Sequence, residues 1–324
     1  PRVAIDGHAV ERVRGAYTCV ALLEVEGQQT LVAFRDPHGV RPGVYGKNAQ
    51  GAWCVASESV ALDAMDFELA GEIPPGSVMF MRPGEAARVE AVLPPRSRRC
   101  MFERIYFARP DSMMSDGRVF NVRWALGERL GEEWRAKGLA ADVVVPVPDT
   151  SRPAAQAMAE TLGLPFREGF IKNRYSGRTF IMPDARARQS ALRLKLNPIP
   201  EILEGKRVIL VDDSVVRGAT VRRLAEIVRL AKPREVHLAI FSPPVKNPCY
   251  YGIDMPSRDE LVAAKLPEAE WARAFGVDTV TFLSVEGLRA TAGSPACMAC
   301  FDGDYPVPVS DAERNAIVAD RRGA

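Results

Sequence analysis

Val208 to Thr220 read VILVDDSVVRGAT, a short apolar run followed by two acids and a turn of small residues. The run 208–211 predicts a strand buried on both faces of a parallel sheet. Asp212 and Asp213 follow at the strand end, where open α/β sheets bind their ligands. The residues after them lead into a helical pattern, and a helix N-terminus attracts phosphate through its N–H groups and dipole. The stretch therefore predicts an α/β fold with an anion site beside two carboxylates.

Length and composition narrow the class of protein. A chain of 324 residues favours two domains. With 43 basic and 41 acidic side chains, composition suggests neither a nucleic-acid nor a membrane partner. The chain has no apolar run of about 18 residues and no signal peptide, so we expect a cytoplasmic protein. Six cysteines without a secretory context argue against a disulfide scaffold.

Two patterns divide the chain. Residues 1–95 are β-rich, with expected strands at 16–23, 30–34, 53–59 and 78–81, which favours an antiparallel layer. Residues 96–290 alternate between the two element types, and 291–324 form a cysteine-bearing segment and tail. In the middle part we expect helices at 119–137 and 152–162 and strands at 142–147, 166–172, 208–211 and 236–241. This alternation predicts a parallel sheet covered on both faces.

Two further loops suit a phosphate site. In Val145 to Ser151, VPVPDTS, a strand ends and a helix starts, so its N–H groups and the Thr150 hydroxyl can meet a pyrophosphate or its magnesium. A plain turn with a Thr/Ser helix cap is the alternative. Lys172, Arg174 and Arg178 surround a glycine and form a candidate lid, although a basic loop can also be solvated surface.

The cysteines form a second pattern. Cys297 and Cys300 make a CxxC, with Cys100 and Cys249 as distant candidate partners. Structural zinc, a redox pair and an iron–sulfur cluster all fit this spacing, which does not choose among them. The remaining two cysteines lie inside apolar runs and are interpreted as small buried hydrophobes.

The opening stretch resembles the phosphoribosylpyrophosphate (PRPP) signature of type I phosphoribosyltransferases. Further strings extend the resemblance over nearly the whole chain, to the glutamine PRPP amidotransferase (amidophosphoribosyltransferase) family. They are, in order, GAYTCVALL, AFRDPHGVRP, VASESVALD, CMFERIYFARPDS, VPVPDTS, IKNRYSGRTFIMP, VILVDDSVVRGAT, NPCYYGIDMPS and CMACFDGDYP.

The resemblance implies a fold, an activity and a set of ligands. The fold would be an α/β type I phosphoribosyltransferase domain, preceded by the C-terminal half of an Ntn-hydrolase glutaminase domain, an α+β antiparallel sandwich. The activity would be transfer of glutamine-derived ammonia to PRPP in the first committed step of purine synthesis. The implied PRPP-binding residues are Asp149, Thr150, Ser151, Asp212, Asp213, Ser214, Val215, Val216, Arg217, Gly218, Ala219 and Thr220. Magnesium would bind Thr150, Asp212 and Asp213, and a [4Fe–4S] cluster would bind Cys100, Cys249, Cys297 and Cys300. A homo-oligomer and inhibition by purine nucleotides are also implied.

The chain departs from the family at its first residue. Family members place there a cysteine that attacks the glutamine amide, whereas this sequence has Pro1. We therefore expect only the ammonia-dependent transfer from the chain as written, and we interpret it as truncated. Two alternatives are a PRPP-sensing regulatory module without catalysis and a salvage phosphoribosyltransferase. A regulator of transcription would need a DNA-binding unit, and the sequence has neither a helix-turn-helix pattern nor a basic face. A salvage enzyme fits the PRPP signature but not the β-rich part or the cysteines.

Overall fold

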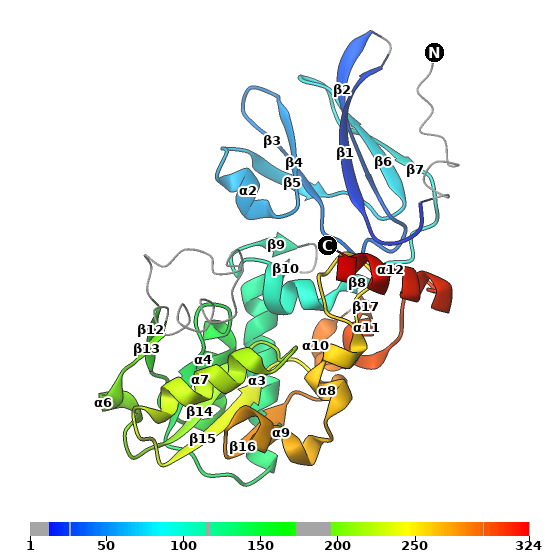
Figure 1. The fold of residues 1–324 in the computed structure, drawn as a ribbon. Coiled ribbons are helices and arrows are strands. Elements are labelled where there is room, and N and C mark those ends of the chain that lie inside the picture. Colours follow the sequence, from blue (N-terminus) through cyan, green and yellow to red (C-terminus); the bar gives the residue numbers. More distant parts are fainter. Residues whose placement is uncertain (1–12, 26, 115–116, 173–195, 294, 324) are drawn as a thin grey trace. The chain divides into compact units, whose positions relative to one another are not determined.

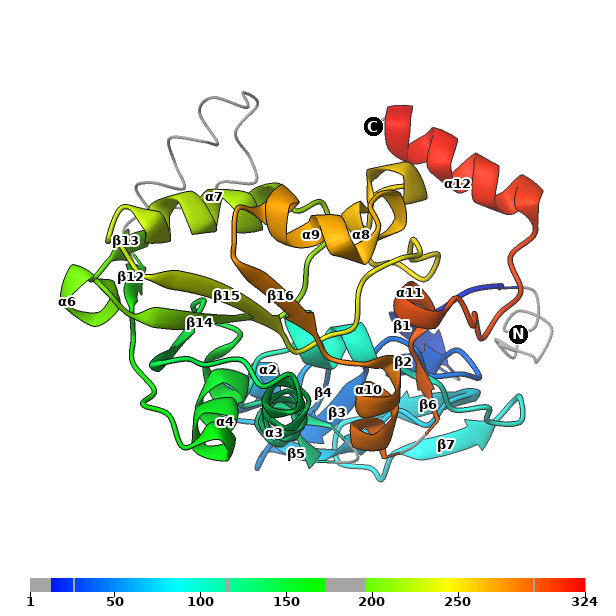
Figure 2. The ribbon, with the colours of Figure 1, turned by 90° about the horizontal axis from the view of Figure 1, so that it is seen from below.

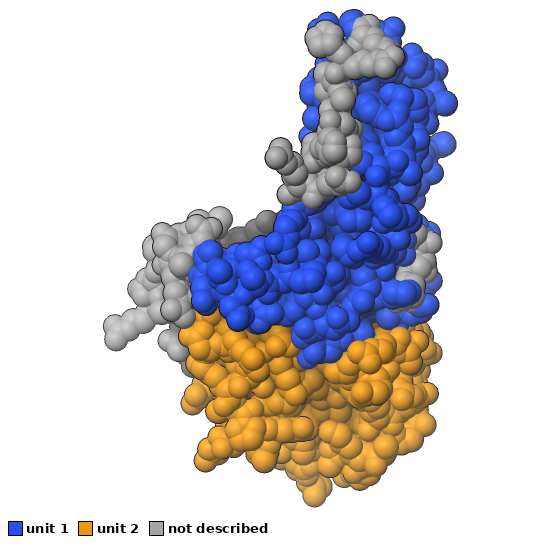
Figure 3. Space-filling view, turned by 90° about the vertical axis from the view of Figure 1, so that its right-hand side faces the viewer, with its two compact units in different colours: residues 1–121, 248–255, 292–324 blue, residues 122–247, 256–291 orange. Residues whose placement is uncertain are grey.

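The computed structural model describes residues 13–25, 27–114, 117–172, 196–293 and 295–323. The chain forms two compact units (Figure 3). Unit 1 comprises residues 1–121, 248–255 and 292–324, and unit 2 comprises residues 122–247 and 256–291. The predicted domain borders after 95 and 290 stay a prediction. No helix in the described part of the chain has the length and apolar character that a membrane crossing needs.

Unit 1 contains two antiparallel sheets (Figure 1). The first has the order β1-β2-β6-β7, with bounds Thr18–Val25, Gln28–Arg35, Ser77–Met81 and Arg88–Ala91. The second has the order β4-β3-β5, with bounds Trp53–Ala56, Val44–Lys47 and Glu68–Glu72. Ala33 and Met79 of the first sheet lie in one core cluster with Tyr45 and Trp53 of the second. Residues 13–95 thus form the expected antiparallel layer.

The rest of unit 1 consists of short elements. They are α2 (Ser59–Asp63), β8 (Arg99–Cys100), a π-helix (Glu103–Phe107), β9 (Met113–Met114), β10 (Gly117–Arg118), β17 (Ala296–Cys297), α11 (Ala299–Asp302) and α12 (Asp311–Gly323). The β8 and β17 strands pair in parallel although nearly 200 residues separate them in the sequence. This pairing brings two distant segments of the chain together.

Unit 2 is built on the predicted parallel sheet. Its order is β11-β14-β15-β16, with bounds Val143–Pro146, Arg207–Asp212, Glu235–Ile240 and Thr279–Phe282. The helices are α3 (Val119–Ala136, which begins in unit 1), α4 (Arg152–Leu162), α6 (Pro200–Leu203), α7 (Ala219–Arg229), α8 (Val262–Lys265), α9 (Glu268–Phe275) and α10 (Val285–Ala292), with a 3₁₀ turn at Arg258–Glu260. Figure 2 shows α7, α8 and α9 on one face of the sheet and α3, α4 and α10 on the other. The sheet is therefore covered on both faces.

One predicted strand has a different role. Within 166–172, only β12 (Phe170–Lys172) is a strand, and it pairs antiparallel with β13 (Leu196–Pro198). Phe166 still makes a single bridge to Val144. A Cβ on Gly169 would lie 2.7 Å from Val145 Cγ1, so the chain passes close over β11 here and continues outside the sheet. The prediction that this whole segment is a strand of the parallel sheet was wrong.

Helices α3 and α4 pack at very short range. Gly127 and Gly131 lie on the α3 face that meets α4, and a Cβ on Gly127 would stand 2.1 Å from the carbonyl oxygen of Ala154. No side chain fits at that distance, so the glycine is required for the two backbones to approach. This contact helps to fix α4, which begins directly after one of the predicted site loops.

We expect Gly127→Ala to lower the free energy of unfolding by about 1–3 kcal/mol, because the methyl group must push the helices apart. Urea unfolding of the native and variant chains measures the difference. Glu132→Ala is the matched control, since Glu132 is exposed on the same helix, and it should change stability by less than about 0.5 kcal/mol. A Gly127→Ala chain as stable as the native one would contradict the close contact.

Candidate functional site

Two loops leave neighbouring strands at the carboxyl edge of the parallel sheet. Strands β11 and β14 pair in parallel with Pro146 opposite Val211. The N–H of Val147 donates to the carbonyl of Val211 at 2.9 Å. Because of this register, the loop 147–151 begins beside Asp212. The residues predicted for pyrophosphate and those predicted for ribose and magnesium thus come from adjacent strands.

The two acids after β14 are tightly placed. Asp213 is 7% exposed and accepts a hydrogen bond of 2.6 Å from the Ser214 hydroxyl, while its own N–H donates to Asp212 Oδ1 at 2.9 Å. Burial raises the pKa of Asp213 to about 6. Burial, together with the charge of Asp213, raises the pKa of Asp212 well above its usual value. Since neighbouring carboxylates repel each other and favour a bound cation, this donor set fits a hard divalent ion such as magnesium.

Arg123 is a site residue that the sequence prediction missed. It lies in α3, is 1% exposed, and its positive charge lowers the pKa of Asp213 against the effect of burial. Its position could have revealed it, because Val119, Arg123, Leu126 and Leu130 follow the spacing of one buried helix face. A charged residue inside such an apolar stripe indicates a partner in the interior.

The loop 214–218 before α7 is partly buried, and the helix turn that follows it begins with exposed residues. Val215 is 1% exposed and belongs to the core, so only its backbone can serve a ligand. Gly218 has φ +80°, and a Cβ there would lie 2.8 Å from a Phe275 ring carbon. Ala219 and Thr220 follow in the first turn of α7 and are exposed. The N–H groups of a first helical turn have no partner within the helix, so this end can receive a phosphate.

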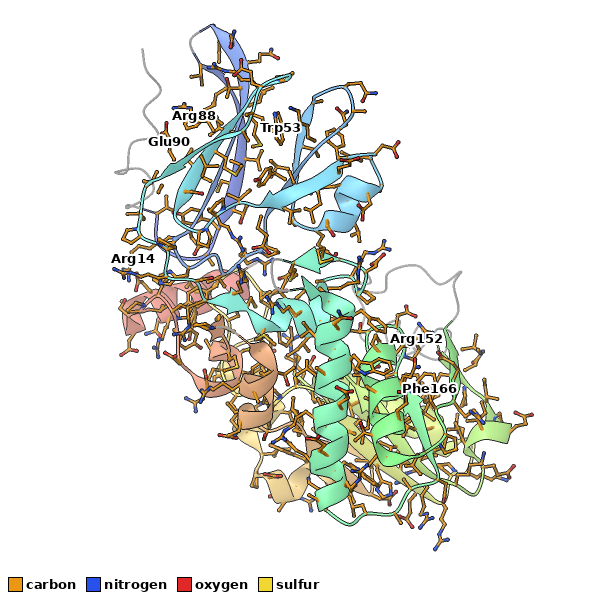
Figure 4. The ribbon with its side chains drawn as sticks, turned by 180° about the vertical axis from the view of Figure 1, so that it is seen from behind. Arg14, Trp53, Arg88, Glu90, Arg152 and Phe166 are labelled. Atoms are coloured by element: carbon orange, nitrogen blue, oxygen red, sulfur yellow. The ribbon has the colours of Figure 1, made fainter. Side chains whose placement is uncertain are left out.

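The loop 147–151 is held by its own side chains. The hydroxyl of Ser151 donates to the carbonyl of Val147, and Ser151 is fully buried. Asp149 accepts a 2.6 Å hydrogen bond from Arg152, which also donates to Glu168 at 2.7 Å. Figure 4 shows Arg152 beside the segment that carries Phe166. Ser151 therefore shapes the loop, and its hydroxyl is used internally.

The other predicted site residues are described only in part. Thr150 is half-buried. Lys172 ends β12, whereas Arg174 and Arg178 lie outside the described residues. The ligand roles of all these residues stay predictions.

Four cysteines in unit 1 line one cavity. Cys100 in β8 stands opposite Cys297 in β17, Cys300 lies in α11, and Cys249 comes from the segment 248–255. Cys100, Cys297 and Cys300 are each less than 10% exposed. The cysteines of β1 and β4 do not line this cavity. The fold thus brings together the four thiols that the sequence resemblance grouped.

Burial in this cavity disfavours the charged thiolate form of the cysteines, whereas backbone N–H groups that donate to sulfur favour it. Burial raises the pKa of Cys297 to about 11, and the N–H of Ala299 acts in the opposite direction. The N–H of Tyr251 donates to the sulfur of Cys249 at 3.3 Å. Such N–H donors stabilise sulfur that carries negative charge, as thiolate ligands of a metal centre do.

In the part of the chain that the structure describes, no group of three or more His, Cys, Asp or Glu side chains is arranged to hold a metal ion. A single zinc ion would need four ligand atoms about 2.0–2.3 Å from one point. In a four-iron cluster each thiolate binds a different iron atom, which places the sulfurs farther apart. A set of four thiols around one cavity, three of them buried, is chemically suited to such a cluster.

A buried arginine shapes the loop that supports Cys100. Arg35 is 1% exposed and donates to the carbonyls of Gly39 at 2.8 Å and Arg41 at 2.9 Å. The carbonyl of Val40, between them, accepts the N–H of Cys100 at 3.1 Å. The loop 39–41 thus supports the strand that carries Cys100.

Residues 122–254 match the family model described as the phosphoribosyl transferase domain. The amidophosphoribosyltransferase of Methanothermobacter thermautotrophicus is 44% identical over 302 residues, which are 92% of this chain and 62% of the relative. That of Archaeoglobus fulgidus is 41% identical over 315 residues, which are 94% of this chain and 67% of the relative. The chain belongs to the amidophosphoribosyltransferase family.

A solved structure supports the same family. The structure of the glutamine PRPP amidotransferase from B. subtilis, complexed with ADP and GMP, superposes on this chain with a TM-score of 0.83 and 38% sequence identity. The match includes 94% of this chain and 67% of the B. subtilis chain. The predicted family and the type I phosphoribosyltransferase fold are thereby confirmed. The chain spans 62% to 66% of the length of the first two curated relatives it matches.

Asp213→Asn should make the ligand-free chain more stable at pH 8. The pKa of Asp213, about 6, lies above its value near 4 in an unfolded chain, so the folded state binds a proton more tightly and stability falls as pH rises from 4 to 6. With EDTA present, we expect a gain in unfolding free energy of about 1–3 kcal/mol at pH 8 and almost none at pH 4.

Asp142→Asn is a control for which we expect the opposite change in stability, because the pKa of Asp142 is lowered and not raised. Arg207 lowers the pKa of Asp142 to about 2, so this variant should be less stable than the native chain at pH 8. Urea unfolding at both pH values measures the two effects. A loss of stability in Asp213→Asn at pH 8 would contradict the cost assigned to its buried carboxylate.

Proposed function

We propose that the protein transfers ammonia to C1 of PRPP and releases pyrophosphate, giving 5-phosphoribosylamine in the first committed step of purine synthesis. The observation that carries this proposal is the register of β11 and β14, which places the loop 147–151 beside Asp212. One edge of the sheet then offers places for both ends of PRPP. Membership of the amidophosphoribosyltransferase family supports the same activity.

The described residues suit the parts of this substrate. The first turn of α7 would receive the 5′-phosphate, and Asp212 and Asp213 would hold the ribose hydroxyls and magnesium. Magnesium, when bound, would neutralise charge on the leaving pyrophosphate. Loop 149–151 would bind that pyrophosphate through its N–H groups, with Thr150 beside the metal. Displacement at C1 passes through a state with cationic character at the sugar, so positioning and charge neutralisation suffice and no side-chain nucleophile is needed.

Water must be kept from the reactive sugar. We assign this task to the lid formed by Lys172, Arg174 and Arg178, the last two of which lie outside the described residues. Closing over the pyrophosphate would favour attack by ammonia over attack by water. These cations would also add to the neutralisation of the leaving group.

The wider setting follows from the family. Glutamine would supply the ammonia in the whole protein, purine nucleotides would inhibit it, and the assembly would be a homo-oligomer in the cytoplasm. The B. subtilis relative is a glutamine PRPP amidotransferase solved with ADP and GMP, which supports a nucleotide site in the family. A nucleic-acid or membrane partner is not part of this proposal.

We assign the cysteine cavity to a [4Fe–4S] cluster held by Cys100, Cys249, Cys297 and Cys300. Their common cavity, the burial of Cys100, Cys297 and Cys300, and the backbone donors to sulfur support the assignment. The cluster would link the segments of unit 1 that carry the four thiols.

With PRPP, magnesium and an ammonium salt, the chain should release pyrophosphate, and EDTA should abolish the release. Asp213→Asn should lower kcat/KM for PRPP by about 10–100-fold, the usual effect of disturbing a metal ligand. A coupled pyrophosphate assay measures both. Glu226→Gln, an exposed change on α7, should leave the rate unchanged. If the folded chain gives no magnesium-dependent release, the proposed activity is wrong.

Protein purified without oxygen should contain about four iron and four sulfide ions per chain, as a [4Fe–4S] cluster requires. Cys297→Ser should lose most of the iron, whereas Cys54→Ser, a change in β4, should keep it. Iron and sulfide analysis with visible absorbance provides the measurement. One zinc ion per chain in place of iron would refute the cluster assignment.

A further inference from the structure

Two consecutive residues of the loop before α7 are bound by one neighbouring segment, residues 257–262, which we call the bracing segment. The N–H of Val262 donates to the carbonyl of Val216 at 3.0 Å. The Nε of Arg217 donates to Oε2 of Glu260 at 3.0 Å. One contact fixes the backbone of the loop, and the other fixes its only cationic side chain.

The bracing segment is itself well anchored. Leu261 is fully buried, and the Ser257 hydroxyl donates to the second carboxylate oxygen of Glu260 at 3.1 Å. The next loop residue, Gly218, lies so close to Phe275 that a Cβ would stand 2.8 Å from the ring. The loop is therefore supported at 216, 217 and 218 from the side of α8 and α9.

The arginine of this loop is directed at a carboxylate. Glu260 uses both oxygens, one toward Ser257 and one toward Arg217. The hydrogen bond from Arg217 lowers the pKa of Glu260, so the carboxylate is charged at neutral pH. A guanidinium whose charge is compensated in this way has less to offer a phosphate than a free one.

We propose that Glu260 is a positioning residue that holds the loop 214–218 in its phosphate-binding conformation. Arg217 connects the loop to the bracing segment through its hydrogen bond to Glu260. This proposal rests on the proposed binding of PRPP at that loop. It reassigns Arg217, which the sequence resemblance grouped with the PRPP ligands. The phosphate would then be held by the backbone N–H groups of the loop and of α7.

The test compares four chains: native, Glu260→Gln, the charge-swapped R217E/E260R, and Glu270→Gln as control. Glu270 forms an exposed ion pair with Arg273 within α9. Amide hydrogen exchange over residues 214–219 of the ligand-free protein measures the order of the loop. The KM for PRPP and kcat of the ammonia-dependent reaction measure its effect on the substrate.

Glu260→Gln should speed exchange over the loop and raise the KM for PRPP, each by about fivefold with kcat little changed, as expected for loss of an exposed ion pair. The charge-swapped chain should recover both values, and the control should match the native chain. Unchanged exchange in Glu260→Gln would overturn the proposal. A charge-swapped chain that regains slow exchange but keeps a KM raised tenfold or more would also overturn it, because Arg217 would then be a phosphate ligand. A native chain that binds no PRPP refutes the proposed function instead, while the exchange data still decide whether Glu260 orders the loop.

Discussion

The candidate transfer site depends on the parallel pairing of β11 with β14. Opposite residues in this pair are Pro146 and Val211, and the hydrogen bond from Val147 to Val211 continues the register one step beyond the strand. A slip of one residue would turn the side chains at the end of β14 to the other face of the sheet and move the start of loop 147–151 along it. The residues at the two ends of the apolar run oppose such a slip, because it would carry Arg207 or Asp212 into a position that is almost completely buried. The same apolar packing that stabilises the sheet therefore positions two loops for one ligand.

Buried charge is the second constraint, and both units contain it. In unit 2, Asp213 is buried within the influence of Arg123, which offsets only part of the cost of burial. In unit 1, Arg35 and Asp36 are almost completely buried, and Asp36 accepts backbone N–H groups on both oxygens. Arg35 satisfies its charge with carbonyl oxygens and a glutamate. The two cases differ in what the charge achieves. Burial raises the pKa of both Asp36 and Asp213. Arg35 and Asp36 shape a loop, whereas Asp213 adjoins a second acid, Asp212, and such a pair of carboxylates favours a bound cation.

Local sequence patterns predicted the helices and strands whose formation depends mainly on nearby residues. The apolar run 208–211 and the helix 152–162 were recovered almost to the residue, since burial on both faces and a proline in the first turn are strong signals. Long-range contacts were harder to predict. The departure of the chain at Gly169 depends on which segment lies opposite, so no local pattern predicts it. The spacing in α3 indicates that Arg123 faces inward, but it does not identify Asp213 as the acid whose pKa Arg123 lowers. Convergence of the cysteines came from family resemblance, since spacing alone left zinc, redox and cluster chemistry open.

The cysteine segments of unit 1 contain little regular secondary structure. Residues 248–255 contain no helix or strand in the described structure, and the pairing of β8 with β17 comprises two residue pairs. Hydrogen bonds from Tyr251 to Val307 and from Tyr305 to Pro248 also join these segments. Ordering segments about 50 to 200 residues apart still carries an entropic cost that grows with loop length. A centre bound by all four thiols would join Cys100, Cys249 and the CxxC at once, and its binding energy would then be folding energy. On this reasoning, loss of the cluster would disorder these segments of unit 1 first, while the parallel sheet of unit 2, with its own apolar core, would remain folded.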